Sequence, residues 1–168
     1  PEVIERRSYT YPTETIKKAI HMIEKSERPF VFVGGGAIAA GASEELKEFV
    51  EKIDAPVADS LMGKGAYDGT NPRYTGMLGM HGTKTSNLGV SRCDLLIVVG
   101  ARFSDRVTGN TAKFARNAKI IHIDVDAAEI NKNVAVDLGI VGDAKSILGA
   151  LNLLLAQQNH PQWLKEIR

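Results

Sequence analysis

The sequence predicts an α/β domain of three layers, in which helices cover both faces of a parallel β-sheet. Short apolar runs alternate with amphipathic helical patterns along the chain, as they do in successive βαβ units. The run from Leu95 to Val99 is apolar at every position rather than at every second one. Such a run is typical of a strand that is buried on both faces. A chain of 168 residues suits one domain of this kind.

The first half of the chain is expected to contain two helices and three strands. Apolar residues recur at i, i+3, i+4 and i+7 over 13–26, which predicts an amphipathic helix that stops before Pro29. Ser43 is expected to cap the second helix, because serine is a preferred N-cap residue. The strands are expected at 30–33, at 56–58 and near 74–78, the last within a glycine-rich loop that runs from Asp59 to Gly82.

The second half continues this alternation. The expected elements are, in chain order, helix 83–91, strand 95–99, strand 120–123, short helix 127–132, strand 138–141 and a last helix capped by Asp143. The apolar face of that helix is expected to consist of Ile147, Leu148, Leu151, Leu154 and Leu155. Right-handed crossovers between the parallel strands give a Rossmann-like arrangement.

Composition argues against several classes of partner. Lys and Arg number 21 against 20 Asp and Glu, so no excess of basic charge points to nucleic acid or to a membrane surface. The single cysteine, Cys93, allows no internal disulfide and suits a reducing compartment, which predicts a cytoplasmic protein. The charged and polar segment 1–12 does not resemble a signal peptide and is expected to be an interdomain linker.

The first candidate binding turn is Gly34-Gly35-Gly36, which follows the first expected strand. With Ala39, these glycines match the G-x-G-x-x-G/A pattern of dinucleotide-binding turns, and Asp59 follows at roughly the expected distance. That pattern normally opens a helix at once, whereas Gly41 and Ser43 predict a later helix start. A stand-alone NAD(P)-binding module and a glycine turn that binds nothing are therefore both alternatives.

The strongest candidate turn, Gly100-Ala101-Arg102, follows the most apolar strand. A second arginine, Arg106, comes shortly after it, and Asp105 is placed to orient one of the two. Ligands of open α/β sheets bind at the carboxyl ends of the strands, and arginine suits bidentate contact with phosphate. The turn therefore predicts a ligand that carries phosphate.

Other chemistry-bearing residues have plainer interpretations. His122 and Asp124 form an H-x-D pair that lacks a third metal ligand, so His122 is expected to be a packed strand histidine. Cys93 is expected to be buried and inert, and Asp143 to serve as a helix N-cap. We expect no metal site and no catalytic residue in this segment.

Taken together, the turns resemble the central domain of thiamine-diphosphate-dependent enzymes, above all the catalytic large subunit of acetolactate synthase (acetohydroxyacid synthase). The resemblance covers almost the whole chain, in the family's order. It is carried by Val33-Gly34-Gly35-Gly36, Ser60-Leu61-Met62-Gly63-Lys64-Gly65, Gly76 to Gly82, Asp94 to Val107, Ile121 to Asp126, and Gly142-Asp143-Ala144. The runs Gly76–Gly82 and Gly100–Val107 are its specific part.

The resemblance implies a Rossmann-like domain with six parallel strands that binds FAD, which has no net redox role in acetolactate synthase. The implied FAD contacts are Gly34, Gly35, Gly36, Ser60, Leu61, Met62, Leu78, Gly79, Met80, His81, Gly100, Ala101, Arg102, Asp105, Arg106, Val107, Asp124, Val125, Gly142, Asp143 and Ala144. Met80 and Arg106 would also face the substrate channel of the parent enzyme. Ser60 and Ser104 depart from the family pattern, in which many members have threonine at the first position and some have an acidic residue at the second.

The resemblance also implies that the chemistry lies outside this chain. The family's thiamine-activating glutamate and its Gly-Asp-Gly…Asn motif for Mg²⁺ and diphosphate belong to flanking domains, and neither is found here. The expected division is a linker over 1–12, an FAD-binding central domain over 13–157, and a connector over 158–168 toward a further domain. This segment alone would be inactive.

The implied parent is a transferase of branched-chain amino-acid biosynthesis. It would decarboxylate pyruvate and join the remaining unit to pyruvate or 2-oxobutanoate, giving 2-acetolactate or 2-aceto-2-hydroxybutanoate. Its implied partners are the flanking domains of the same chain, further copies in a homodimer or homotetramer, and in some cases a regulatory small subunit. Two more possibilities stay open, namely the central domain of a pyruvate oxidase or glyoxylate carboligase, and a structural domain that binds nothing.

Overall fold

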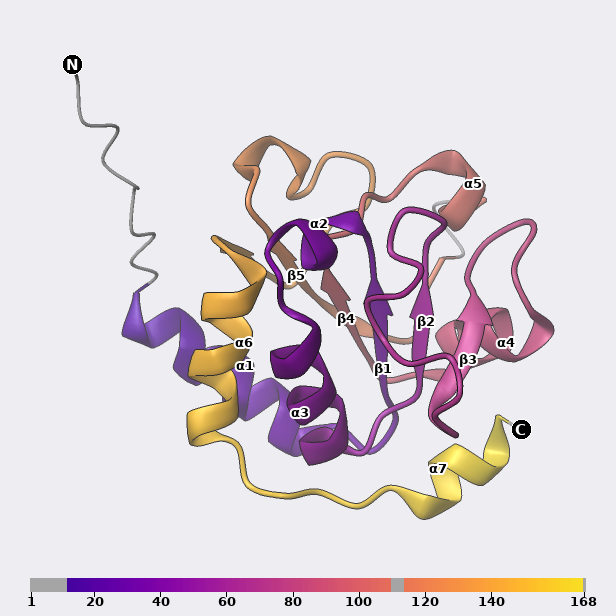
Figure 1. Cartoon of the computed structure of the whole chain (residues 1–168), viewed down its shortest axis with the longest axis horizontal. Coiled ribbons are helices and arrows are strands. Elements are labelled where there is room, and N and C mark those ends of the chain that lie inside the picture. Colours follow the sequence, from indigo (N-terminus) through magenta and orange to yellow (C-terminus); the bar gives the residue numbers. More distant parts are fainter. Residues whose placement is uncertain (1–11, 110–113, 168) are drawn as a thin grey trace.

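The fold is a six-stranded, all-parallel sheet with helices on both faces, which confirms the predicted α/β architecture (Figure 1). The computed structural model describes residues 12–109 and 114–167, so most of the predicted linker 1–12 lies outside the described residues. The strands are β1 (Pro29–Val33), β2 (Val57–Asp59), β3 (Tyr74–Met77), β4 (Leu95–Val99), β5 (Lys119–Asp124) and β6 (Leu138–Val141).

Seven helices accompany these strands in the described part of the chain. They are α1 (Thr13–Lys25), α2 (Gly35–Ala39), α3 (Ser43–Ile53), α4 (Lys84–Arg92), α5 (Asp105–Thr108), α6 (Ala144–Leu154) and α7 (Pro161–Glu166), with a 3-10 turn at Ala127–Glu129. None of these helices is both long enough and apolar enough to cross a membrane.

The strand order is β3-β2-β1-β4-β5-β6, so the first strand along the chain lies in the middle of the sheet. From β1 it winds outward to β3, crosses back to β4, and winds outward to β6 on the other side. The direction reverses between β1 and β4, whose last residues Val33 and Val99 are register partners. In such a sheet, a ligand is expected in the crevice at the carboxyl ends of those two strands.

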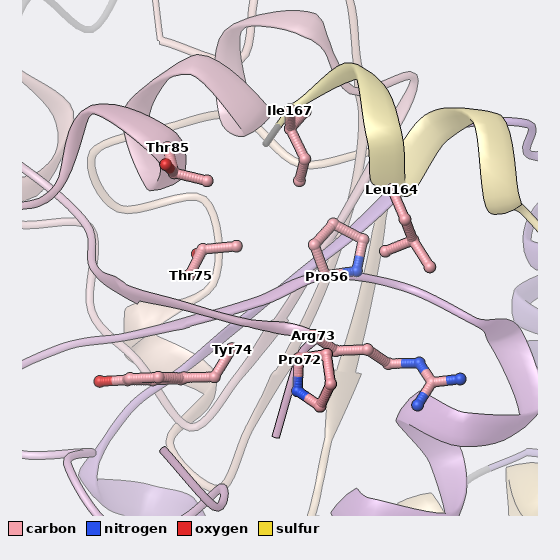
Figure 2. Close-up of a pocket in the computed structure, with 8 residues that line it drawn as sticks. All are labelled: Pro56, Pro72, Arg73, Tyr74, Thr75, Thr85, Leu164 and Ile167. Atoms are coloured by element: carbon pink, nitrogen blue, oxygen red, sulfur yellow. The ribbon is translucent and has the colours of Figure 1, made fainter. Parts of the chain in front are cut away.

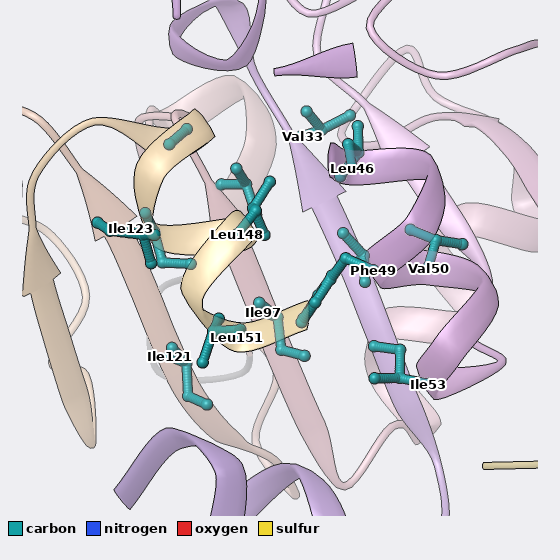
Figure 3. Close-up of a cluster of buried hydrophobic side chains, with 14 of the residues drawn as sticks. Val33, Leu46, Phe49, Val50, Ile53, Ile97, Ile121, Ile123, Leu148 and Leu151 are labelled. Atoms are coloured by element: carbon teal, nitrogen blue, oxygen red, sulfur yellow. The ribbon is translucent and has the colours of Figure 1, made fainter. Parts of the chain in front are cut away.

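The core lies in two layers, one on each face of the sheet. Successive residues of a strand point to opposite faces, so the fully apolar run of β4 contributes to both layers. On one face, Phe49 of α3 and Leu148 of α6 pack over the strands near Ile97 (Figure 3). On the other face, Val90 of α4 and Trp163 of α7 belong to the second cluster.

The structure corrects the prediction for the segment after β1. A five-residue helix, α2, begins at Gly35, one residue after the strand, whereas the sequence predicted no helix between the first strand and Ser43. The Ala37 N–H donates to the Gly34 carbonyl at 3.2 Å, and α2 ends before Gly41, whose φ of +66° breaks the helix. The late helix start, which weakened the match to the dinucleotide-binding pattern, is therefore not what the structure shows.

The predicted cap of α3 is also wrong by one residue. Ser43 is the first helical residue, and Ala42 occupies the N-cap position without a side-chain hydrogen bond. The Ala42 carbonyl nevertheless accepts the first helical bond, from the Leu46 N–H at 2.8 Å. The predicted cap of α6 is correct, because Asp143 accepts a hydrogen bond from the Ser146 N–H at 3.0 Å.

Two differences concern the end of the chain. Leu154 was expected on the apolar face of α6 but is exposed, because the helix ends there and the chain continues in an extended conformation at Leu155, which is buried. The sequence also did not predict α7, which lies in the expected connector 158–168. Whether that segment connects to another domain stays a prediction.

Residues 156–167, here called the C-terminal strap, cross the amino-terminal edge of the sheet (Figure 1). The Trp163 indole N–H donates to the Pro29 carbonyl at 2.7 Å, and a ring nitrogen of His160 lies 2.8 Å from the Ile53 carbonyl oxygen. Trp163 is buried. The strap therefore packs at the edge opposite the carboxyl ends of the strands.

Candidate functional site

A cavity of about 750 Å³ opens at the carboxyl edge of the sheet, around the point where the strand order reverses. It is lined by turns that follow β1, β2, β3 and β4. These lining residues are Gly35, Gly36, Ser60, Leu61, Met62, Met77, Leu78, Met80, His81, Gly100, Ala101, Arg102, Ser104 and Val107. The volume lies in the range of about 300–1,000 Å³ that is typical of small-molecule and cofactor sites.

The cavity brings together most, but not all, of the predicted site residues. Those that do not line it are Gly34, Gly79, Asp124, Val125, Gly142, Asp143 and Ala144. The last five lie at or after the ends of β5 and β6, on the same edge of the sheet but outside this cavity. The side chains of Asp105 and Arg106 lie outside what the structure describes.

Two lining residues, Met77 and Ser104, were not among the predicted contacts. Met77 is the last residue of β3, and a strand end on this edge was the signal that could have found it. Ser104 lies inside the predicted turn and was noted only as a departure from the family pattern.

The glycines around this cavity pack backbone against backbone. A Cβ on Gly34 would lie 2.5 Å from the Gly100 oxygen and 2.6 Å from the Ala101 Cα. A Cβ on Gly63 would lie 2.5 Å from the Val33 oxygen. Gly100 also has a φ of +61°, a conformation that disfavours any side chain. Close approach of one turn to another therefore accounts for these three glycines without a ligand.

Three of the residues that line the cavity are large, apolar and exposed. Leu61, Met62 and Met80 have 71%, 76% and 72% of their surface exposed. Large exposed apolar side chains that are grouped in this way mark an interaction site. The Met80 loop is held from α4, since Asn87 accepts a hydrogen bond from the Gly79 N–H at 3.0 Å and donates one to the Gly79 carbonyl at 2.9 Å.

The turn over 100–103 is fixed through its carbonyl groups. The Gly100 carbonyl accepts from the Gly36 N–H at 2.9 Å, and the Phe103 carbonyl accepts from the Asn133 amide at 2.8 Å. Within the described part of the chain, the N–H groups of Ala101 and Arg102 have no hydrogen-bond partner. Both residues line the cavity, which makes these N–H groups candidate donors to a ligand there, although Ala101 is only 3% exposed.

Arg102 provides the described positive charge at this turn. Its Nε lies 3.9 Å from an Oε1 of Glu129, and its side chain is 77% exposed. An ion pair of that length and exposure is weak, so it orients the guanidinium without neutralising it. The side chain is therefore free to pair with an anion in the cavity.

Two other predicted residues have structural roles. His122 is fully buried, as expected of a packed strand histidine. Cys93 is also buried, and burial, reinforced by the neighbouring Asp94, raises the pKa of its thiol to about 12. The burial agrees with the prediction for Cys93, and the raised pKa favours the protonated thiol, which is the less reactive form.

The environment of Asp59 argues against the NAD(P) alternative. That alternative needs the carboxylate to reach a ribose hydroxyl, but Asp59 is only 1% exposed and does not line the cavity. Its Oδ2 accepts a hydrogen bond from the Tyr74 hydroxyl at 2.9 Å. Burial raises the pKa of this carboxyl, although the Tyr74 hydrogen bond and Lys64 oppose the shift.

A second, smaller hollow of about 220 Å³ lies between β3, α4 and α7 (Figure 2). Its one arginine, Arg73, already pairs with Asp54 at 2.8 Å, and the Tyr74 hydroxyl is bound to Asp59. It therefore offers no free charged group, unlike the carboxyl-edge cavity, which is the candidate functional site.

The structure shows a doubly wound α/β domain with a cavity at its topological switch point, and comparison with known families makes the class specific. The model of the thiamine pyrophosphate enzyme central domain matches residues 16–151. This match covers most of the chain, so the chain belongs to that family.

Individual proteins with high similarity to the chain include large subunits of acetolactate synthase. The chain is 52% identical over 155 residues to the probable acetolactate synthase large subunit of Methanocaldococcus jannaschii, covering 90% of this chain and 26% of that protein. It is 46% identical over 173 residues to the acetolactate synthase isozyme 3 large subunit of Escherichia coli, covering 100% of this chain and 30% of that protein. It is also 46% identical over 178 residues to the acetolactate synthase large subunit of Haemophilus influenzae, covering 99% of this chain and 31% of that protein. The chain thus spans about a quarter to a third of the length of these relatives.

Proposed function

We propose that this chain binds FAD in the carboxyl-edge cavity and serves as the central domain of an acetolactate synthase large subunit. The observation that carries the proposal is the cavity itself, at the reversal point of the sheet, in a chain 46% identical to curated large subunits. The relatives bear the name of the enzyme, and the cavity supplies a place for the cofactor that the family resemblance implies.

The residues present fit FAD. Its diphosphate needs hydrogen-bond donors and positive charge, which the Ala101 and Arg102 amides and the Arg102 guanidinium offer. Its flavin ring system needs an apolar surface, which Leu61, Met62 and Met80 offer, since methionine packs well against aromatic rings. As the family resemblance implies, bound FAD would have no net redox role and would form part of the wall beside the reacting groups.

The parent would condense two 2-oxo acids. One pyruvate loses CO₂, and its remaining two-carbon unit forms a new carbon–carbon bond to the carbonyl carbon of a second 2-oxo acid. With pyruvate as acceptor the product is 2-acetolactate, and with 2-oxobutanoate it is 2-aceto-2-hydroxybutanoate. Thiamine diphosphate and Mg²⁺ would be held by flanking domains of the parent, so the 168-residue chain alone should form no acetolactate.

Calorimetric titration of the 168-residue chain with FAD, NAD and ADP in separate experiments tests the binding proposal. We expect a response to FAD and a weaker one to ADP, which contains the adenosine and diphosphate of FAD. Tight binding of NAD without a response to FAD or ADP would overturn it and revive the NAD(P) alternative. Supplying pyruvate, thiamine diphosphate, Mg²⁺ and FAD to the same chain tests the second point, and acetolactate formation would contradict it.

A further inference from the structure

We propose that His122 is the positioning residue of the candidate site, holding the 100–103 turn through the Ala101 carbonyl so that the turn presents its amides and Arg102 to the ligand. The proposal deepens the proposed function and rests on it for the identity of the ligand. The geometry of the turn can be tested without any ligand.

The imidazole of His122 lies directly against the turn. His122 belongs to β5 and is 0% exposed, and its Nε2 is 2.9 Å from the Ala101 carbonyl oxygen. The Phe103 ring contacts it edge to face, with ring centroids 5.0 Å apart and an interplanar angle of 80°. One side chain on a central strand therefore touches two residues of the turn that lines the cavity.

The proton of the neutral imidazole is located by its acceptor. A carbonyl oxygen only accepts hydrogen bonds, so the short contact requires that Nε2 carries the hydrogen. The other nitrogen, Nδ1, is buried and has no partner among the described residues. An unpaired acceptor there is tolerated better than an unpaired buried N–H, so the neutral tautomer with hydrogen on Nε2 satisfies the site.

Asp124 is not the main partner of the imidazole. Its Oδ2 lies 3.6 Å from Nε2, which is too long for a good hydrogen bond, and its Oδ1 already accepts from the Asp126 N–H at 2.9 Å. The Nε2 hydrogen is therefore committed to Ala101. The carbonyl groups of Gly100, Ala101 and Phe103 therefore each accept a hydrogen bond from elsewhere in the protein, and the bond from His122 is the middle one of the three.

These ties leave the amide groups of the turn to other partners. When the carbonyls of a short turn point into the protein, its N–H groups are available, and those of Ala101 and Arg102 have no partner among the described residues. Without His122, the Ala101 carbonyl would lack its buried partner and would gain by rotating toward water. That rotation would move the adjoining Arg102 amide away from the cavity.

The test uses a matched set of variants of the 168-residue chain. In His122→Gln the side-chain amide extends far enough to donate to Ala101, whereas His122→Asn is one methylene shorter and His122→Phe keeps a ring without a donor. Ile121→Val removes a methylene from the neighbouring buried residue on the opposite face of β5, which controls for general loss of packing. Each variant is measured for FAD affinity by flavin fluorescence, for melting temperature, and for amide hydrogen exchange over 100–104 without ligand.

We expect His122→Phe and His122→Asn to weaken FAD binding about tenfold, the value of one ordinary hydrogen bond, and to speed amide exchange in the turn. His122→Gln should restore both, and Ile121→Val should lower the melting temperature without changing either. If Ile121→Val and His122→Phe change affinity and exchange in proportion to their melting temperatures, His122 is only a packing residue and the proposal is wrong. If His122→Phe does not fold, the Asn and Gln pair decides the question.

The two proposals fail in different ways. If the unaltered chain binds no FAD but His122→Asn still speeds exchange over 100–104, the positioning role holds and the ligand assignment fails. If FAD binds the unaltered chain and exchange in the turn is the same in all four variants, the positioning role fails while the proposed function stands.

Discussion

Replacing Gly34 by alanine should destabilise the protein, because the added Cβ would overlap the turn that follows β4. The Cβ would lie 2.5 Å from the Gly100 oxygen and 2.6 Å from the Ala101 Cα, where ordinary contacts are 3.4–4 Å. Gly34 itself has an extended backbone, with φ −120° and ψ −170°, which alanine also adopts. The effect is therefore steric, and it falls on two buried backbone segments that have little freedom to separate.

The magnitude follows from two opposing contributions. Overpacking a buried site costs about 1–3 kcal/mol, and a shortfall of nearly 1 Å between backbone segments places Gly34→Ala near the upper end of this range. Alanine also lowers the entropy of the unfolded chain, which returns about 0.4–1 kcal/mol. The net loss should be about 2 kcal/mol, a fall of roughly 4–8 °C in melting temperature for a chain of this size.

Gly149→Ala is the matched control. Gly149 lies inside α6, and its added Cβ would meet nothing within 4 Å. The same chemical change should there raise stability by about 1 kcal/mol, because alanine is the better helix former. Thermal unfolding followed by far-UV circular dichroism, with urea titration as a second measure, distinguishes the two signs. If Gly34→Ala is as stable as the unaltered chain, the β1 and β4 turns do not pack as described.

The remaining predictions concern charge. Arg102→Ala should weaken FAD binding by about 1.5–3 kcal/mol if the guanidinium bonds to phosphate, whereas Arg92→Ala should not; equal calorimetric affinities would remove Arg102 from the site. Because the pKa of Asp59 is raised in the folded protein, the protonated carboxyl is the form that the fold favours. Its contribution to stability is complete below the ordinary pKa of 3.8 and is lost as the pH rises through the pKa of the folded state. The melting temperature of Asp59→Asn relative to the unaltered chain should therefore rise from pH 4 to 7, and a constant difference would refute this. Burial lowers the pKa of His122, so its contribution is complete above pH 6.5 and is lost as pH falls through the lower folded pKa. The difference in melting temperature between the unaltered chain and His122→Gln should therefore shrink from pH 7 to pH 5. A difference that stays constant would show that the imidazole is not buried in solution.

Local patterns predicted the sheet well because its strands are marked by composition alone. The run Leu95–Val99 is buried on both faces, and five apolar residues in succession are what such a strand requires. The N-cap role of Asp143 was likewise predictable, since it depends only on residues within one turn of α6.

The elements that were missed depend on contacts between distant residues. α2 is held by the bond from the Gly36 N–H to the Gly100 carbonyl, and no local pattern reports that partner. α7 is placed by Trp163, whose indole bonds to Pro29 from more than a hundred residues away. A short helix of this kind has little stability of its own, so its sequence carries little helical signal.

The position of the candidate site could be predicted in outline, because its turns follow strands that composition identifies. Residues of the turns that line the cavity, such as Met80 and Arg102, are found from the strand that precedes them. The hydrogen bond between His122 of β5 and Ala101, in the turn after the neighbouring strand β4, is seen only in the three-dimensional arrangement. Packing of Gly34 against Gly100 also shows why a glycine pattern by itself is a poor indicator of a bound dinucleotide.

The C-terminal strap has a practical consequence for protein engineering. The family match ends at residue 151, but the strap places Trp163 against the start of β1 and ties His160 to the end of α3. A domain excised or exchanged at residue 151 would expose an apolar surface at the amino-terminal edge of the sheet. It would also leave the Pro29 and Ile53 carbonyl groups without the partners that the strap provides. Chimaeras that replace this domain should therefore keep the strap with it, through the buried Ile167.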